Sequence, residues 1–341
     1  MSVQSDPLRV AEHAVLSATS VARWVANRFE QVQSISKNDK SPVTAADFAV
    51  QATVSIILRQ QLEDAPRIVG EESADLLEGD EGAPMLALVG DAVRTMLPGA
   101  TDSQVLEAIG SCDHDGTAER FWTLDPVDGT KGFLRRQQYA VSLGLIESGT
   151  VVLGVLGCPN LPWSQDQPLD VADSIGTCFS AVDGGGCRMF PADHADSSNA
   201  KSLSRRQRQP GDDIRVCESV EKAHSNQDDS ARLMDALPGR ATAVRLDSQC
   251  KYGLVARDQA DVYLRLPVKP GYVEKIWDHA AGMIVATEAG AIVSDVQGNP
   301  LDFSRGARLE ANRGVICAAA EIHGALIEQI ASMGIADAVG N

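Results

Sequence analysis

The stretch FWTLDPVDGT constrains the fold most, because it places two acidic residues directly behind an apolar run. Asp125 and Asp128 flank a Pro-Val pair, and proline has a fixed φ and no backbone N–H. We therefore expect a strand that ends in a turn and presents both carboxylates beside the Val127 carbonyl. The Gly-Thr step that follows, with Thr130, is expected to begin a helix whose free N–H groups favour a phosphate oxygen.

Other acidic residues also lie where an expected helix or strand begins or ends. Asp47 lies near the start of the helix in SPVTAADFAVQ, with Thr44 as its N-cap, and Asp278 begins the helix in WDHAAG. Glu71 and Glu72 end the short strand RIVG. Such ends can face one cleft, and Mg²⁺ prefers carboxylate and carbonyl oxygens. If these ends converge, the sequence predicts a magnesium site.

Each acid also has an ordinary structural interpretation. An Asp at a helix start is more often a cap than a metal ligand, and DPVDG alone is a good turn signal. Glu71 and Glu72 could form a solvated strand end. The spacing does not match the D-x-D-x-D-G pattern of an EF-hand calcium loop. The prediction therefore depends on several acids converging, rather than on any one of them.

The order of the expected elements predicts an α/β fold in two parts. At 341 residues, two domains are the reasonable expectation. Helices precede strands in residues 1–160, an α+β domain with most of the expected metal ligands, and they alternate in residues 161–341, an α/β domain. An amphipathic helix is expected over residues 8–35. Residues 76–106 are expected to form a partly helical excursion, and the polar residues 191–213 a mobile loop.

Charge and cysteine content argue against several classes of function. A net charge of −17 and a pI near 4.7 do not suit a nucleic-acid-binding surface. The seven cysteines form no CxxC pair, which argues against a zinc or redox site, and their odd number favours a reducing compartment over secretion. No signal-peptide pattern or membrane-spanning apolar run is evident. We expect a cytoplasmic protein with a small-molecule ligand. An anionic ligand would need bound cations and a few Lys or Arg to reverse the acidic field locally.

Several segments together resemble one family of enzymes. VTAADFAVQ, VGEES, LDPVDGTKGFL and WDHAAGMIVATEAGAIVSD resemble the metal-dependent, lithium-sensitive phosphatase superfamily that includes inositol monophosphatase. LGVLGCPNL, VEKAHS, LDSQCKYGLVA and ADVYLRLP narrow the resemblance to the 3′(2′),5′-bisphosphate nucleotidase family. The resemblance covers the chain from about Ser41 to Phe303, with gaps in the acidic excursion and in the SRRQRQ segment.

The resemblance implies a layered αβαβα sandwich and a site that holds two or three Mg²⁺ ions. Matched position by position, the implied metal ligands are Glu71, Asp125, the Val127 carbonyl, Asp128 and Asp278. The pair that activates the attacking water is implied to be Asp47 and Thr130. The implied substrate-binding positions are Thr130, His224, Ser248, Lys251, Arg265 and Asp278.

The activity that the resemblance implies is hydrolysis of the 3′-phosphate of adenosine 3′,5′-bisphosphate to adenosine 5′-monophosphate (AMP), in sulfur assimilation and salt tolerance. The sulfated analogue, 3′-phosphoadenosine 5′-phosphosulfate, is a second substrate of this kind. An inositol phosphate phosphatase is the alternative enzyme, since the metal motifs are shared. Lys251 and Arg265 discriminate between the two, because a monophosphate gives them no second phosphate to hold. An inactive nucleotide-binding sensor is the alternative of another class.

Overall fold

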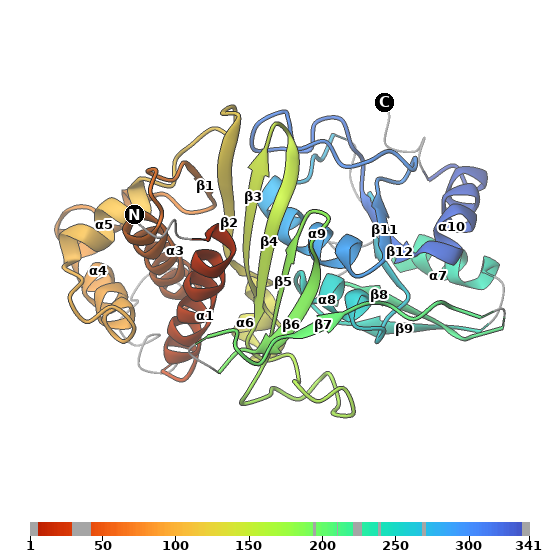
Figure 1. Cartoon of the computed structure of the whole chain (residues 1–341), viewed down its shortest axis with the longest axis horizontal. Helices are drawn as coiled ribbons and strands as arrows, with labels where there is room; N and C mark the ends of the chain where they lie inside the picture. The colour runs from red at the N-terminus through yellow and green to blue at the C-terminus, as the bar shows by residue number, and fades with distance from the viewer. Residues whose placement is uncertain are drawn as a thin grey trace.

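The computed structural model describes residues 6–28, 42–193, 196–209, 211–220, 227–237, 240–267 and 271–335. In this part of the chain, helices and sheets form five alternating layers (Figure 1). An outer layer of helices covers a seven-stranded sheet, and a pair of helices separates this sheet from a five-stranded one. Further helices cover the far side of the second sheet. The predicted layered αβαβα arrangement is confirmed.

The first sheet is built from strands that follow one another in the chain, in the order β1 to β7. Among these strands only β1 and β2 run parallel to each other, so their C-terminal ends lie on the same side of the sheet. Glu71 and the two aspartates of the DPVD segment lie at these strand ends. The strands are β1 (Ile68–Gly70), β2 (Arg120–Asp128), β3 (Ala140–Glu147), β4 (Thr150–Cys158), β5 (Thr177–Val182), β6 (Gly186–Pro191) and β7 (Lys201–Leu203).

Helices α1 (Pro7–Ala26) and α3 (Pro42–Gln61) cover the outer face of this sheet (Figure 1). α1 ends earlier than its apolar spacing predicted, with Asn27 as its C-cap. α3 begins at a proline, which favours the first helical position. Thr44 therefore lies inside α3 and is not its N-cap, and Asp47 follows in the second turn.

The excursion predicted over residues 76–106 is helical, as expected. A short 3₁₀ turn, η1 (Ala74–Leu77), leads into α4 (Gly79–Arg94), and α5 (Asp102–Gly110) follows. Both helices pack against α3 and against each other. Their buried faces extend the hydrophobic core that α1 and α3 share with the first sheet.

Helices α8 (Cys250–Ala256) and α9 (Ala280–Glu288) form the layer between the two sheets (Figure 1). α9 lies close to β4 because this strand carries a glycine beneath it. A Cβ atom on Gly154 would lie 2.4 Å from Cγ2 of Ile284, far inside van der Waals contact. This close packing fixes the start of α9, and with it Asp278 immediately before the helix.

The second sheet has the strand order β11-β12-β10-β8-β9. β8 runs parallel to β9 and β10, whereas β12 is antiparallel to both of its neighbours. Helices α7 (Gln227–Ala236) and α10 (Ala320–Ser332) lie on its outer face (Figure 1). The strands are β8 (Ile214–Glu218), β9 (Ala241–Arg245), β10 (Val262–Arg265), β11 (Ala291–Ser294) and β12 (Val315–Ala319).

In its described part, the polar segment 191–213 is more regular than the loop that we predicted, and its mobility stays a prediction. Part of the segment forms β7, and the side chains of Arg205 and Arg208 are 4% and 5% exposed. Both contact the buried carboxylate of Asp261, with Arg208 Nη1 at 2.8 Å and Arg205 Nη2 at 3.5 Å. A polar composition indicates a loop only when water solvates its charged side chains. Here Arg205 and Arg208 instead pair with Asp261, a buried residue far along the chain.

The division of the chain near residue 160 stays a prediction. β5 to β7 follow this position yet belong to the first sheet, and the second sheet begins with β8.

All seven cysteines are buried free thiols, as expected for residues that pack in the core. Within the described part of the chain, no helix combines the length and apolar character that crossing a bilayer requires.

We expect Gly154→Ala to destabilise the protein by about 1–3 kcal/mol, because the added methyl group overpacks the contact between β4 and α9. Gly324→Ala in α10 is the matched control. Nothing lies within 4 Å of a Cβ atom at Gly324, and alanine is the better helix former. Urea unfolding of both variants measures the difference, and equal free energies of unfolding would contradict the close packing of α9.

Candidate active site

A pocket of about 390 Å³ opens where the first sheet meets α8 and the segment before α9. Its walls include the start of α6 (Thr130–Leu134) and the 3₁₀ turn η3 (Ile276–Asp278). The predicted site residues that line it are Glu71, Asp125, Val127, Asp128, Thr130, Ser248, Lys251, Arg265 and Asp278. Asp47 is buried beside this pocket, and His224 lies outside the described residues.

Asp125 and Asp128 lie on a bulged strand and not in the turn that we predicted. β2 continues to Asp128, and its register shifts between Asp125, opposite Ser142, and Asp128, opposite Ala140. Side chains three residues apart on a regular strand point to opposite faces, so the extra residue lets both carboxylates reach one pocket. Pro126 explains the bulge, because proline has no N–H for the ladder.

Glu71 and Asp47 approach these aspartates from two other elements. Glu71 directly follows β1, and Asp47, 7% exposed, comes from the second turn of α3. Gln51, one turn later, ties the two elements together. Its side chain donates to the Glu72 carbonyl at 2.7 Å and accepts from the Glu72 N–H at 3.2 Å. Burial, followed by the charges of Glu72 and Glu71, raises the pKa of Asp47 well above its usual value.

The carboxylates at the strand ends oppose one another's ionisation. Burial, then the charges of Glu71 and Asp128, raises the pKa of Asp125 well above its usual value. Burial and the charge of Asp278 raise the pKa of Asp128 to about 6, although Lys251 lowers it. Glu71 is open to the pocket, but nearby protein atoms displace part of its hydration. This loss of hydration and the charge of Asp278 raise the pKa of Glu71 to about 7.

These residues fit a divalent cation. A positive ion relieves the repulsion among the carboxylates, and the hard oxygens of acids and of the Val127 carbonyl suit Mg²⁺. Oδ1 of Asp125 is buried and has no hydrogen-bond partner within the described residues. A buried polar atom without a protein partner normally binds water or an ion. The donor set therefore matches the predicted metal site.

A second group of possible ligand atoms is an ion-pair network. Carboxylate and imidazole atoms of Glu274, Asp278 and His279 lie within 4.8 Å of one another. Arg265 stands between the two acids, with Nη2 2.6 Å from Glu274 and 3.0 Å from Asp278. The guanidinium already supplies the positive charge here, so Asp278 is the one member of this group that we assign to the metal site.

Lys251 and Ser248 face the acids from the start of α8. Lys251 is 3% exposed, with Nζ 3.3 Å from the Leu246 carbonyl and 5.1 Å from the centre of the Tyr263 ring. Burial lowers the pKa of Lys251, against the opposing effect of the Asp128 charge. The pocket thus has an acidic wall and, facing it, a cation that an anionic ligand can reach.

The two walls touch at Gly129 and Ser248. Both have a positive φ, 88° at Gly129 and 70° at Ser248, and a Cβ atom on Gly129 would lie 2.8 Å from Cβ of Ser248. The neighbouring backbone N–H of Gln249 donates a hydrogen bond to the Asp128 carboxylate. Glycine is required at this junction, because only it allows both the conformation and the close approach.

Sequence reasoning missed two residues that hold the pocket together. The side chain of Gln249 donates to the Trp277 carbonyl at 2.9 Å and accepts from the Gly282 N–H at 3.0 Å, so it joins α8 to α9. Glu274 is 6% exposed and pairs with the pocket arginine described above. The available signal was proximity, since Gln249 lies within LDSQCKYGLVA and Glu274 lies three residues before WDHAAGMIVATEAGAIVSD, two segments that carry the family resemblance.

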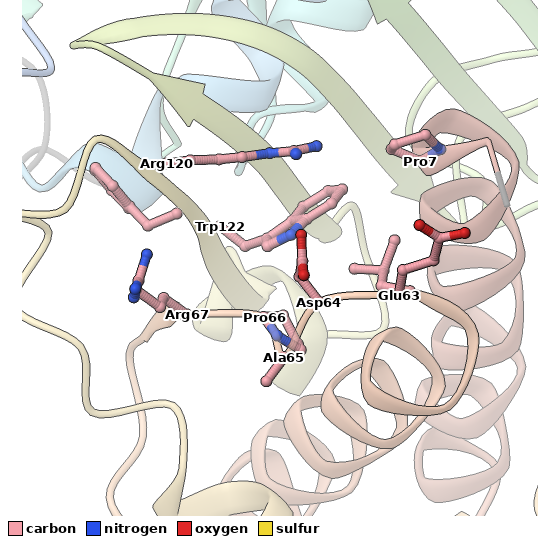
Figure 2. Close-up of a pocket in the computed structure, with 10 residues that line it drawn as sticks. Pro7, Glu63, Asp64, Ala65, Pro66, Arg67, Arg120 and Trp122 are labelled. Carbon is pink, nitrogen blue, oxygen red and sulfur yellow. The ribbon is translucent and has the colours of Figure 1, made fainter. Parts of the chain in front are cut away.

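A larger cavity of about 660 Å³ lies at the opposite ends of β1 and β2 (Figure 2). Figure 2 shows Arg67 and Arg120 on the side of the sheet, and Glu63 and Asp64 on the side of α3. Arg120 pairs with Glu147 at 3.0 Å across the β2–β3 ladder. The charges that line this larger cavity are exposed and of both signs. The cavity therefore lacks the buried set of like charges that makes the smaller pocket the candidate active site.

Comparison with known proteins finds a family model and named relatives that match most of the chain. A family model described as the inositol monophosphatase family matches residues 6–334. A protein of Emericella nidulans, named 3′(2′),5′-bisphosphate nucleotidase, is 41% identical over 345 residues and is covered to 96%, with 94% of this chain. The Arabidopsis thaliana protein named 3′(2′),5′-bisphosphate nucleotidase 1 is 42% identical over 297 residues, which cover 83% of each chain.

Solved structures with a similar fold cover nearly the whole chain. CysQ from Bacteroides thetaiotaomicron, described as a bacterial member of the inositol monophosphatase family, has a TM-score of 0.63 at 21% identity over 93% of this chain and 98% of that one. Inositol monophosphatase from Anabaena has a TM-score of 0.60 at 19% identity over 95% of both chains. At these identities the likeness establishes the fold alone.

We expect Asp125→Asn to raise the melting temperature in chelator, because it removes a charge from a set that repels itself. The same variant should lose the stabilisation that Mg²⁺ gives the unaltered protein, about 2.7 kcal/mol at a hundredfold excess over Kd. Glu147→Gln, in an exposed pair outside the pocket, is the control and should keep the Mg²⁺ response. Thermal unfolding with and without Mg²⁺ measures both effects, and an unchanged response in Asp125→Asn would contradict the metal site.

Proposed function

The chain belongs to the inositol monophosphatase family, and from this premise we propose that it is a metal-dependent 3′(2′),5′-bisphosphate nucleotidase. The reaction is hydrolysis of the 3′-phosphate of adenosine 3′,5′-bisphosphate, which releases AMP and inorganic phosphate. One observation carries the proposal: a single pocket is lined by a carboxylate cluster on one side and by two cations, Lys251 and Arg265, on the other, and the two sides meet where Arg265 pairs with Asp278. The first suits the phosphate that is cleaved, and the second suits a phosphate that is kept. Relatives that are named for this activity align with most of this chain and with most of their own length.

The acidic wall is the proposed binding site for two or three Mg²⁺ ions. Its ligands would be Glu71, Asp125, the Val127 carbonyl, Asp128 and Asp278. Bound Mg²⁺ neutralises charge on the phosphate and acidifies a water molecule. The protein's own part is to hold these oxygens in place: the strand bulge aims the two aspartates, and the Gln249 N–H orients the Asp128 carboxylate.

Asp47 and Thr130 are the proposed pair for activating water. Thr130 lines the pocket at the start of α6, and α3, which carries Asp47, contacts α6. The water oxygen attacks phosphorus as its proton passes to the Thr130 hydroxyl, whose own proton passes to the Asp47 carboxylate. The bond between phosphorus and the ribose 3′-oxygen breaks, and that oxygen takes up a proton from solvent.

Ser248, Lys251 and Arg265 line the pocket opposite the acidic wall, and this basic wall is the proposed binding site for the 5′-phosphate. The Lys251 ammonium and the Arg265 guanidinium form charge-assisted hydrogen bonds with phosphate oxygens, and the Ser248 hydroxyl can add a third. His224 is proposed to contact the base or the sugar. This arrangement also answers the charge problem posed by the sequence, because the local cations oppose the acidic field of the whole chain.

Lys251→Met and Arg265→Gln should lower kcat/KM for adenosine 3′,5′-bisphosphate about ten- to a hundredfold. A hydrogen bond to a charged group contributes roughly 1.5–3 kcal/mol, and both residues are proposed to contact the 5′-phosphate. Hydrolysis of adenosine 3′-monophosphate should change little, since it lacks that group. Steady-state assays on both substrates test this, with the exposed Arg305→Gln as control. Equal losses on both substrates would favour an inositol phosphate phosphatase, and no turnover of either by the unaltered protein would favour a nucleotide sensor.

Lithium should inhibit the enzyme at concentrations where potassium does not. A small monovalent ion can occupy one of the Mg²⁺ positions but cannot supply its charge. Phosphate release is measured at fixed Mg²⁺ during titration with LiCl and, as the matched control for ionic strength, with KCl. Identical residual activity in the two titrations would show that this family property does not extend to the chain.

A further inference from the structure

Glu274 is a buried carboxylate with no part in the proposed reaction, and yet it contacts the pocket. It lies just before η3, is 6% exposed, and its Oε2 lies 2.6 Å from Nη2 of Arg265. Burial alone would raise the pKa of Glu274, but the charges of Arg265 and His279 outweigh burial and lower this pKa to about 2. Glu274 is therefore a permanent negative charge directly behind the pocket arginine.

The contacts of Arg265 show why Glu274 matters as an anchor, that is, as a residue that fixes the position of the guanidinium. Its Nη2 also lies 3.0 Å from Asp278, a proposed metal ligand, and 3.5 Å from the hydroxyl of Tyr272 at the pocket rim. These three residues hold the guanidinium at one terminal nitrogen, and the side chain of Tyr263 hydrogen-bonds to Arg265 as well. A guanidinium presents several donors in a rigid plane, and fixing one corner sets the direction of the others.

The anchor is itself held from behind by the core. His279 is fully buried, with Nε2 3.4 Å from Glu274 and Nδ1 2.9 Å from the hydroxyl of Tyr252. Tyr252 belongs to α8 and is also fully buried. A continuous chain of polar contacts thus runs from the layer between the sheets to the guanidinium that faces the pocket.

We propose that Glu274 is a positioning residue that aims the Arg265 guanidinium at the phosphate that is not cleaved, and so sets the preference for a bisphosphate over a monophosphate. This inference rests on the proposed function. Asp278 shares the contact with Arg265 but is also a proposed metal ligand, so Glu274 is the partner whose contact does not compete with the metal. Glu274 makes no contact with the acidic wall other than through Arg265 and His279 in the described residues, so its effect should be confined to the basic wall.

The test separates the two phosphates by using two ligands that are not hydrolysed. AMP carries the retained 5′-phosphate, and inorganic phosphate occupies the site of the cleaved one. Calorimetric titration should show that Glu274→Gln weakens AMP binding on the order of tenfold, because a neutral amide no longer holds the guanidinium in place. Binding of inorganic phosphate should be unchanged. In steady state, KM for adenosine 3′,5′-bisphosphate should rise by a similar factor while kcat changes less than about twofold.

Glu12→Gln is the matched control. Glu12 is also a buried carboxylate paired with an arginine, Arg188 at 2.5 Å, but it lies on α1 away from the pocket. It should lose stability without a change in AMP binding. Arg265→Gln should have little further effect on AMP binding in the Glu274→Gln background, because coupled residues are not additive. If Glu274→Gln does not fold, Glu274→Asp keeps the charge, shortens the side chain, and should also weaken AMP binding.

Unchanged AMP binding, or equal losses for AMP and inorganic phosphate, would overturn the role of Glu274. Additive effects of the two substitutions at Glu274 and Arg265 would overturn it as well. Failure of the proposed function has a different signature, because the unaltered protein itself would then not hydrolyse adenosine 3′,5′-bisphosphate.

Discussion

Repulsion among the carboxylates at the ends of β1 and β2 is the constraint on which the rest of the pocket depends. Burial raises the pKa of Asp125, Asp128 and Glu71, and the charge of Asp278 raises all three further. Glu71 and Asp128 also raise the pKa of Asp125. Like charges stay together only when the surrounding structure holds them. Here extensive buried cores on both sides of the first sheet provide that support. The stability given up in this cluster is what makes it able to bind cations.

The opposite charge comes from the other side of the junction. Most of the acids belong to the first sheet and α3, whereas Lys251 and Arg265 come from α8 and the second sheet. The two walls meet where the backbone around Gly129 touches the backbone around Ser248. A pocket with separated charges suits a ligand with two phosphates in different chemical roles. It also explains how a chain with a net charge of −17 can bind an anion.

Buried polar contacts, more than surface charges, set the geometry of this pocket. Gln51 joins α3 to the segment after β1, Gln249 joins α8 to α9, and Glu274 joins the core to Arg265. Each glutamine side chain both donates and accepts a hydrogen bond, and Glu274 pairs with an opposite charge. Buried polar groups need such partners. Such contacts fix direction, which hydrophobic burial alone does not do. Preorganised direction is what binding and transferring a phosphate require.

The sequence by itself predicted most of the charged residues that line this pocket. Acids at element ends, a proline between two of them and a glycine after the second are local patterns. They predicted Glu71, Asp125, Asp128 and Asp278, which line the pocket, whereas Asp47 lies outside its lining. Only the tertiary structure decided how these residues are held. The bulge at Pro126 depends on pairing with β3, the burial of Arg205 and Arg208 depends on Asp261, and the role of Glu274 depends on Arg265 across η3. Local patterns encode the ends of elements because propensities act over a few residues. A partner such as Asp261 is chosen by packing between segments that are distant in sequence, and even the nearby pair of Glu274 and Arg265 forms only when the chain turns back between them, which no local pattern specifies.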